Sequence, residues 1–139
     1  MKIDEIQNGI VLDHIKAGNS MKIYKYLDLD NLDCAVALIR NVKSVKMGKK
    51  DIIKIDSPIV LNLEILGYID AGISVNILKN GVLTDKHKVE LPEKLINVLH
   101  CKNPRCITTV EPHLDSIFKL ADRENGIYRC EYCESEISE

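Results

Sequence analysis

The sequence predicts an α+β fold: a ferredoxin-like antiparallel sheet with two helices, followed by a small all-β domain. Before residue 92, segments with strand and helix character follow one another in the order β-α-β-β-α-β-β. The dipeptide Asn80-Gly81 separates two apolar runs, which is the strongest short-range signal for a β-hairpin. Four of the five cysteines form two close pairs in the C-terminal third of the chain, a pattern typical of a small module held together by a metal.

The first half of the expected sheet domain contains a strand at residues 9–15, a helix at 19–29, and strands at 32–40 and 49–56. Asn19 or Ser20 can cap the helix, because a side-chain oxygen at this position accepts a hydrogen bond from a free N–H of the first turn. Gly48 allows the chain to turn between the strands at 32–40 and 49–56.

The second half of this domain contains a helix at residues 57–69 and strands at 73–78 and 82–91. The dipeptide Ser57-Pro58 marks the helix start, since proline is favoured in a first helical turn. The β-branched residues that follow it leave the helix limits open. We expect both helices on one face of the sheet, to which the last hairpin adds a strand.

The composition is that of a globular protein, with 45% hydrophobic and 29% charged residues in a chain of 139. The formal net charge of −2 disfavours a general nucleic-acid binder. No apolar run approaches the roughly 20 residues that cross a bilayer, and the N-terminus lacks the apolar core of a signal peptide. We therefore expect a cytoplasmic protein that contacts neither a membrane nor nucleic acid.

The paired cysteines are Cys101 and Cys106, which enclose four residues, and Cys130 and Cys133, which enclose two. In a reducing cytosol such pairs are more often metal ligands than disulfides, and the βαβ context of a redox Cys-x-x-Cys pair is missing. Zn²⁺ prefers a tetrahedron of thiolates, and four thiolates leave no open position for water. The sequence therefore predicts one structural zinc ion per chain. Cys34 lies in an apolar run and is interpreted as a small buried hydrophobic residue.

A composition break at Pro92 predicts two domains, at residues 1–92 and 93–139. Within the second domain, short strands are expected at residues 106–110, 117–121 and 126–130. A segment of about 45 residues does not fold reliably on apolar burial alone. Metal binding is therefore expected to supply much of its folding free energy, on the order of 10 kcal/mol.

A lysine-rich segment precedes and enters the expected strand at 49–56. Lys50 and Lys54 share one face of that strand, where their flexible side chains can converge on a polyphosphate. Lys86 and Lys88, on the last strand, can join the same face. The alternative interpretation is a solvated hairpin whose lysines prevent edge-to-edge pairing of sheets.

Asp13 and His14 are adjacent, so on a regular strand their side chains face opposite ways, which argues against a catalytic pair.

Two other functions stay open from the residues alone. A zinc-ribbon nucleic-acid module is one alternative, because Lys102, Arg105 and Arg129 lie beside the cysteines. Many acidic residues and few aromatic ones disfavour it. A zinc enzyme is the other, and a closed four-thiolate shell disfavours it.

Several stretches, taken with the cysteine spacing, point to a known family: GIVLDHI, MGKKDIIKI, SVNIL with Lys86 after it, LPEKLINVLHC, CITTVEP and YRCEYCE. Through them the chain resembles, from end to end, the regulatory chain of aspartate carbamoyltransferase. It departs from relatives at Lys16, where many have proline, and at Gly81, where some have an aromatic residue. Residues 57–70 align poorly. These departures bear on effector preference more than on nucleotide binding.

The resemblance implies a non-catalytic subunit that controls the first committed step of pyrimidine biosynthesis. Its N-terminal domain would bind nucleoside triphosphates, with CTP as inhibitor, ATP as activator and UTP as a further effector. Its zinc domain would dock on the catalytic chain of the enzyme, and two regulatory chains would form a dimer.

The resemblance also assigns residues to these sites. The nucleotide-binding residues would be Val11, Asp13, His14, Lys50, Lys54, Asn76 and Lys86. The zinc ligands would be Cys101, Cys106, Cys130 and Cys133. The residues Ile3, Asp4, Glu5 and Ile6 fall where the N-terminal arm of the family lines the nucleotide site.

Overall fold

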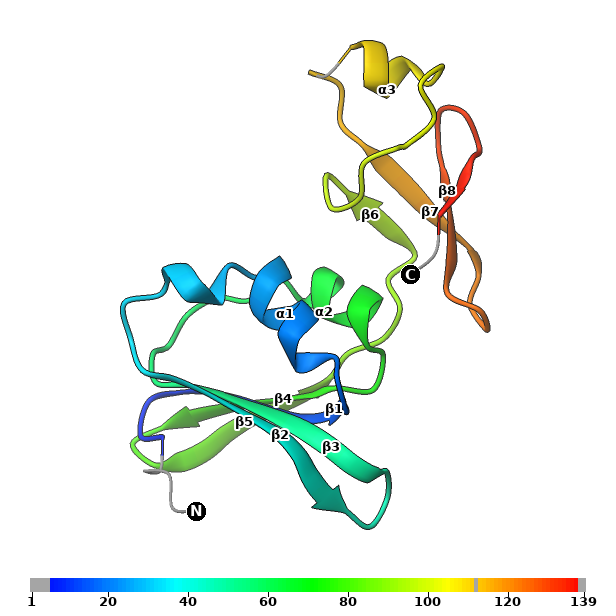
Figure 1. The fold of residues 1–139 in the computed structure, drawn as a ribbon. Helices are drawn as coiled ribbons and strands as arrows, with labels where there is room; N and C mark the ends of the chain where they lie inside the picture. The colour runs from blue at the N-terminus through cyan, green and yellow to red at the C-terminus, as the bar shows by residue number, and fades with distance from the viewer. Residues whose placement is uncertain (1–5, 112, 138–139) are drawn as a thin grey trace. The chain divides into compact units, whose positions relative to one another are not determined.

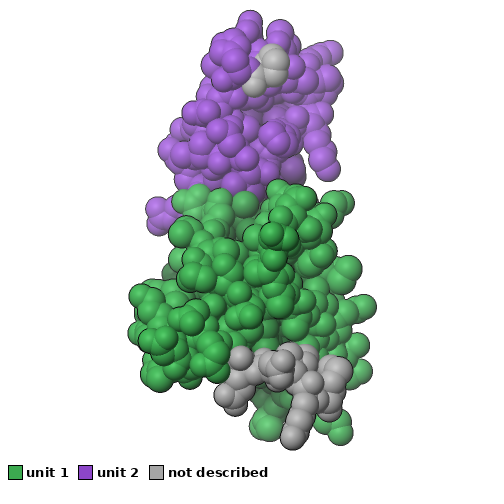
Figure 2. All heavy atoms as spheres, turned by 90° about the vertical axis from the view of Figure 1, so that its left-hand side faces the viewer, with its two compact units in different colours: residues 1–90 green, residues 91–139 purple. Residues whose placement is uncertain are grey.

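The computed structural model, traced in Figure 1, describes residues 6–111 and 113–137. The chain divides into two compact units, residues 1–90 and 91–139, which Figure 2 shows in green and purple. No helix in the described part of the chain is long and apolar enough to cross a membrane.

The described residues of unit 1 form five strands and two helices with one 3₁₀ turn. In chain order they are β1 (Gly9–Lys16), α1 (Ser20–Tyr26), η1 (Leu29–Asn31), β2 (Val36–Ser44), β3 (Gly48–Ile55), α2 (Leu63–Ile69), β4 (Ser74–Lys79) and β5 (Val82–Lys88). The sheet order is β2-β3-β1-β4-β5, and every neighbouring pair is antiparallel. Both α-helices lie on one face of this sheet (Figure 1). The ferredoxin-like arrangement with an added hairpin strand is thereby confirmed.

The core of unit 1 lies between the sheet and its helices. Leu12, Ile53 and Val75 point from the sheet, and Ile23 and Leu66 point from the helices, all with 3% exposure or less. Each such side chain stabilises the fold by about 1.5–3 kcal/mol relative to leaving it in water. No helix of the described residues covers the opposite face of the sheet (Figure 1).

The chain passes unusually close to itself at the start of β1. A Cβ atom built on Gly9 would lie 2.1 Å from the carbonyl oxygen of Ile55 and 3.0 Å from the backbone nitrogen of Ser57. Both neighbours are backbone atoms, which cannot move aside as a flexible side chain can. Glycine is therefore required here so that β1 and the end of β3 can approach.

Helix α2 begins later than the sequence predicted. It starts at Leu63 rather than at Ser57, because the side chain of Asn62 accepts hydrogen bonds from the N–H groups of Glu64 (3.0 Å) and Ile65 (3.2 Å). That capping outweighs the proline signal upstream, where β-branched residues disfavour a helix.

Two boundaries on either side of η1 also differ from the prediction. Helix α1 ends at Tyr26, and Asp28 adopts a left-handed conformation with φ of 50°. The η1 turn follows, so strand β2 begins at Val36 rather than at residue 32. At the other end of the unit, strand β5 ends at Lys88 rather than at residue 91.

In unit 2, the described residues form a four-stranded antiparallel sheet with one short helix. Its elements are β6 (Lys94–Ile96), α3 (Ile107–Val110), β7 (Ile117–Asp122), β8 (Ile127–Cys130) and β9 (Glu136–Ile137), with sheet order β6-β7-β8-β9. Leu95, Phe118 and Tyr128 form its apolar centre with at most 1% exposure. The hydroxyl of Tyr128 donates to the carbonyl of Pro92 at 2.6 Å.

The strand predicted at residues 106–110 is wrong, because this segment forms helix α3. The carbonyl of Cys106 accepts hydrogen bonds from the N–H groups of Thr109 (2.9 Å) and Val110 (3.3 Å). The hydroxyl of Thr109 donates to the carbonyl of Asn103 at 2.9 Å. These local bonds around a cysteine turn override the β-propensity of threonine and valine. Strand β6 was not predicted at all.

Candidate functional site

The uncovered face of the unit 1 sheet carries a row of residues from four neighbouring strands. Val11 of β1 lies opposite Lys54 of β3 on one side and Asn76 of β4 on the other. Asn76 in turn lies opposite Lys86 of β5. With about 4.8 Å between strands, the row spans about 14 Å. Two ammonium groups therefore stand at the ends of a row whose centre is apolar and amide-bearing.

Strand alternation fixes the face on which this row lies. Leu12 and Val75 are buried beneath the helices, so their sequence neighbours Val11 and Asn76 point to the opposite face. The side-chain nitrogen of Asn76 also donates to the carbonyl of Val11 at 3.3 Å. This bond holds the carboxamide against β1 and fixes which groups it presents.

An ion pair lies beside the row. The Nζ atom of Lys50 is 3.0 Å from Oδ1 of Asp13, and both side chains are less than a quarter exposed. Burial alone would raise the pKa of Asp13, but hydrogen bonds from Lys50 and from the N–H of His14, with the charge of Lys50, bring it below the ordinary value. Asp13 is therefore ionised at neutral pH and partly neutralises Lys50.

A β-bulge interrupts β1 between Leu12 and Ile15, and His14 within it has φ of 59°. The imidazole Nδ1 of His14 lies 3.0 Å from the hydroxyl of Ser74. The prediction that Asp13 and His14 face opposite ways assumed regular pleating, and the bulge breaks that assumption. Asp13 contacts Lys50 and His14 contacts Ser74, so both reach groups of the uncovered face.

A hollow of about 420 Å³ adjoins this region of unit 1. Its lining includes His14 and Lys86, two of the predicted nucleotide-binding residues, and also Lys46 and Lys88, which are not among them. A signal for Lys88 was present, because it lies two residues from Lys86 on the same strand face. Of the predicted N-terminal arm, Ile3, Asp4 and Glu5 lie outside the described residues.

The four predicted zinc ligands of unit 2 converge. The Sγ atoms of Cys101, Cys106, Cys130 and Cys133 all lie within 4.8 Å of one another. Cys101 and Cys133 are 3.6 Å apart and Cys106 and Cys130 are 3.7 Å apart at sulfur. Those separations are too long for disulfide bonds. They match the roughly 3.8 Å edge of a tetrahedron with metal–sulfur distances of about 2.3 Å.

Two loops present the cysteines. The first leads from β6 into α3, where the side-chain oxygen of Asn103 accepts from the N–H of Arg105 at 3.0 Å. The second is the turn between β8 and β9, where the carbonyl of Cys130 accepts from the N–H of Glu134 at 2.8 Å. The side chain of Asn103 also donates to the hydroxyl of Ser135 at 3.3 Å, which joins the two loops.

The thiols of this cluster need a cation in order to ionise together. Burial raises the pKa of Cys101 to about 12 and also raises the pKa of Cys130. Hydrogen bonds from Ser135 instead lower the pKa of Cys133 to about 6. Four thiolates at these separations would repel one another strongly, and a divalent metal ion removes that repulsion. The donor set and its geometry therefore fit a tetrahedral metal site.

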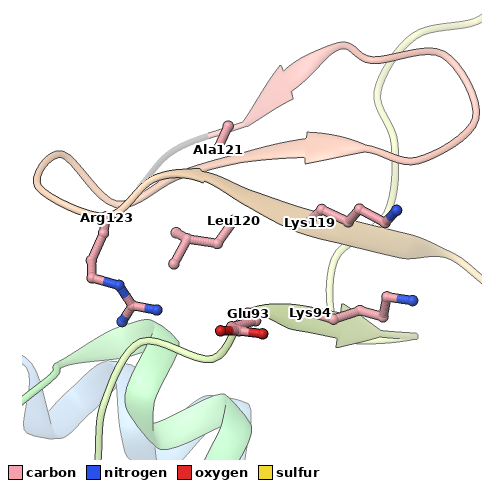
Figure 3. A pocket seen from close by; sticks show the side chains of 6 residues that line it. All are labelled: Glu93, Lys94, Lys119, Leu120, Ala121 and Arg123. Carbon is pink, nitrogen blue, oxygen red and sulfur yellow. The ribbon is translucent and has the colours of Figure 1, made fainter.

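Unit 2 also contains a hollow of about 580 Å³, shown in Figure 3. Lys94 on β6 and Lys119 on β7 lie opposite each other, and their side chains point in the same direction (Figure 3). Lys119 forms an ion pair with Glu131 at 3.0 Å, and Arg123 donates to the carbonyl of Leu91 at 3.1 Å. This hollow is a polar surface whose cations are already partly satisfied.

Fold and sites together define a two-unit α+β protein with a polar sheet face in one unit and a four-cysteine metal-binding module in the other. Residues 1–90 match the family model of the aspartate carbamoyltransferase regulatory chain, allosteric domain, and residues 93–139 match that of its metal binding domain. The chain therefore belongs to the family of aspartate carbamoyltransferase regulatory chains, which are non-catalytic subunits of the transferase complex.

Individual relatives carry the same description. The aspartate carbamoyltransferase regulatory chain of Clostridium botulinum is 49% identical over 134 residues, covering 96% of this chain and 92% of the relative. That of Clostridium tetani is 47% identical, covering 96% and 94%. That of Bifidobacterium longum is 40% identical, covering 98% of both chains.

Proposed function

We propose that this chain binds nucleoside triphosphates on the uncovered face of the unit 1 sheet and so regulates aspartate carbamoyltransferase, with CTP as inhibitor and ATP as activator. The observation that carries the proposal is the row of Lys54, Val11, Asn76 and Lys86 across four strands. It places apolar and amide groups suited to a nucleoside between lysines suited to phosphates. Asp13, His14 and Lys50 border this row, and UTP is a further candidate effector.

Regulation on this proposal works by differential binding. An effector shifts the enzyme between two quaternary states only if it binds one state more tightly than the other. Couplings of this kind are typically about 1–3 kcal/mol, equivalent to about 5–150-fold in affinity. We assign the effector-binding role to residues 1–92 and the contact with the catalytic chain to residues 93–139.

The metal module has a structural role in this proposal. Four thiolates complete the shell of one Zn²⁺, which holds the two cysteine loops in place and supplies no open position for chemistry. In doing so it fixes the surface that docks on the catalytic chain. The thiol-rich site also requires a reducing compartment, which supports a cytoplasmic location.

We further propose that two copies of the chain form a regulatory dimer. Strand β2 lies at an edge of the sheet, and its residues Leu38 and Ile39 are only half-buried. An edge strand with apolar side chains is suited to pairing with another copy. This edge supports the dimer that the family resemblance implies.

Isothermal titration of the zinc-loaded chain with CTP tests the nucleotide site. We expect a Lys54→Ala, Lys86→Ala double variant to bind CTP at least about tenfold more weakly, because each lysine contributes a charge-assisted hydrogen bond. A Lys22→Ala, Lys25→Ala double variant in α1 loses the same charge on the helical side of the unit and serves as the control. Unchanged CTP affinity in the first variant would remove these lysines from the site.

A further inference from the structure

Three lysines of unit 1 line the same hollow of about 420 Å³. Lys86 and Lys88 project from β5, whereas Lys46 comes from the turn between β2 and β3, on a different part of the sheet. His14 also contributes to the lining, and Asp70 is the one carboxylate among the described residues that line the hollow. The hollow thus gathers cations from two separate segments around one space.

Within the described part of the chain, these three ammonium groups have no neutralising partner. Among residues 6–111 and 113–137, no carboxylate forms an ion pair with Lys46, Lys86 or Lys88. Asp70 already accepts a hydrogen bond from the N–H of Lys16 at 2.6 Å. Lys50, by contrast, has its own carboxylate partner in Asp13 at 3.0 Å. An excess of unpaired positive charge around a hollow favours a polyanion.

The turn that carries Lys46 has a defined conformation. The hydroxyl of Ser44 accepts a hydrogen bond from the N–H of Met47 at 3.1 Å, and Gly48 takes the positive φ of 78° that ends the turn. Met47 lines the same hollow as Lys46. Lys46 is therefore presented at the hollow by a short turn whose backbone is fixed at both ends.

Lys86 connects the hollow with the row across the sheet, because it ends the row and also lines the hollow. A ligand that lies along the row and turns at Lys86 along the strand direction, toward Ser74 and Lys88, enters the space that Lys46 also borders. The part of a nucleotide that can extend in this way is its phosphate chain, since each further phosphate adds length and negative charge.

We propose that Lys46 is a specificity-determining residue that makes the site prefer nucleoside triphosphates over the corresponding diphosphates and monophosphates. This inference rests on the proposed function. Lys46 interacts with the phosphates farthest from the sugar, so its contribution grows with the length of the phosphate chain. Lys86 interacts with the phosphates nearer the sugar, so it contributes to the binding of triphosphates, diphosphates and monophosphates alike.

Titration calorimetry with CTP, CDP and CMP on the full zinc-loaded chain tests the proposal. In the Lys46→Ala variant we expect CTP affinity to fall about three- to tenfold while CMP affinity changes less than about twofold, as for one partly exposed charge pair. The Lys46→Arg variant keeps the charge and should retain the preference for CTP. Lys46 is exposed on a turn, so circular dichroism of each variant should match that of the wild-type chain.

The Lys49→Ala variant is the matched control. It removes the same charge from the same hairpin, but strand alternation places Lys49 on the side of buried Asp51, away from the hollow. We expect all three affinities to be unchanged in this variant. Two results would overturn this inference while leaving the proposed function standing. One is an equal loss of affinity for CTP, CDP and CMP in the Lys46→Ala variant, and the other is a loss of CTP affinity in Lys49→Ala as large as that in Lys46→Ala. A wild-type chain that does not bind CTP would overturn the proposed function as well.

Discussion

The hydroxyl of Ser20 donates a hydrogen bond of 2.5 Å to the carboxylate of Asp51, and both side chains are fully buried. The same carboxylate accepts from the N–H groups of Gly18 and Asn41, each at 3.0 Å. Asp51 on β3 therefore ties the start of α1 to a bulge in β2, where Asn41 has φ of 60°. This buried acid holds together the elements from which the lysine-bearing hairpin of β2 and β3 extends.

The Asp51→Asn substitution is expected to destabilise unit 1 by about 3 kcal/mol. The carboxamide has the same shape as the carboxylate, but its NH₂ group would face N–H or O–H donors that now point at a carboxylate oxygen. Those buried donors would then have no acceptor. Urea unfolding followed by far-UV circular dichroism measures the loss. The exposed Asp33→Asn variant removes the same charge and should stay within about 0.5 kcal/mol of the wild type. Equal stability of these two variants would show that the buried network contributes little.

Stability should fall as the solution becomes acidic. Burial alone would raise the pKa of Asp51, but hydrogen bonds from the Ser20 hydroxyl and the N–H groups of Asn41, Gly18 and Ser20 lower it. The unfolded chain, with an ordinary pKa near 3.9, binds protons first as pH decreases. The stability from this group is therefore full above about pH 5 and is lost as pH falls through the lower pKa of the folded state.

Urea midpoints measured between pH 7 and pH 3 check this dependence. We expect little change down to about pH 5 and a steady decrease below about pH 4. Asp13 contributes in the same direction, because its pKa is also lowered in the folded chain. In the Asp51→Asn variant the decrease should be shallower, since one of the carboxylates whose pKa is lowered by folding is gone. An unchanged slope would mean that other carboxylates dominate.

Substitution of Gly9 by alanine should destabilise unit 1 by roughly 2–4 kcal/mol, because the added methyl group meets the Ile55 carbonyl at 2.1 Å. Gly126→Ala is the contrast, since nothing lies within 4 Å of its added Cβ and only the positive φ of 65° is strained. That strain costs about 1 kcal/mol. Thermal unfolding of both variants separates a clash from strain, and equal losses would contradict the close approach of β1 and β3.

Residues near one another in the sequence determined most of what could be predicted about the fold. Alternating apolar residues marked β1 and β3, and Asn80-Gly81 marked the β4–β5 hairpin, because these signals act over a few positions. The start of α2 was missed because the local cap at Asn62 competes with the Ser57-Pro58 signal, and the two cannot be ranked from one sequence. Helix α3 was missed because a cysteine turn overrides the propensity of its residues.

The row across the sheet shows what the sequence could not provide. Lys54, Val11, Asn76 and Lys86 are separated by up to 75 positions in the chain, and their alignment depends on the register of three strand pairs. The turn fixes the register of the β4–β5 hairpin, but the register of β1 with β3 and with β4 depends on how the buried faces of strands distant in the sequence pack together. Lys46 was left out of the predicted site for the same reason, since nothing near it in the sequence indicates that its turn reaches Lys86. The cysteine cluster was easier to predict, because two close pairs of cysteines already indicate four ligands to one metal ion.

Removal of the metal should unfold unit 2 and leave unit 1 folded. Among the described residues, the two loops that carry the cysteines are joined by contacts between the sulfur atoms and by the hydrogen bond from Asn103 to Ser135, so a metal ion bound to the sulfurs would supply most of what holds them together. Metal analysis should find one equivalent of zinc per chain. After chelation, hydrogen exchange should lose protection at Phe118 and Tyr128 while Leu12 and Ile53 remain protected.

Cysteine substitutions make this test specific to the cluster. Cys106→Ser removes a buried ligand and should abolish stable zinc binding, whereas Cys34→Ser removes the one cysteine outside the cluster and should leave the metal content unchanged. The thiol count gives an independent readout, because metal-bound thiolates react slowly with thiol reagents. Cys34 is half-buried rather than buried as predicted, so we expect it alone to react readily in the loaded chain and all five cysteines to react after chelation. A chelated chain that keeps Phe118 and Tyr128 protected would show that unit 2 folds by apolar burial, and the metal would then be dispensable to its structure.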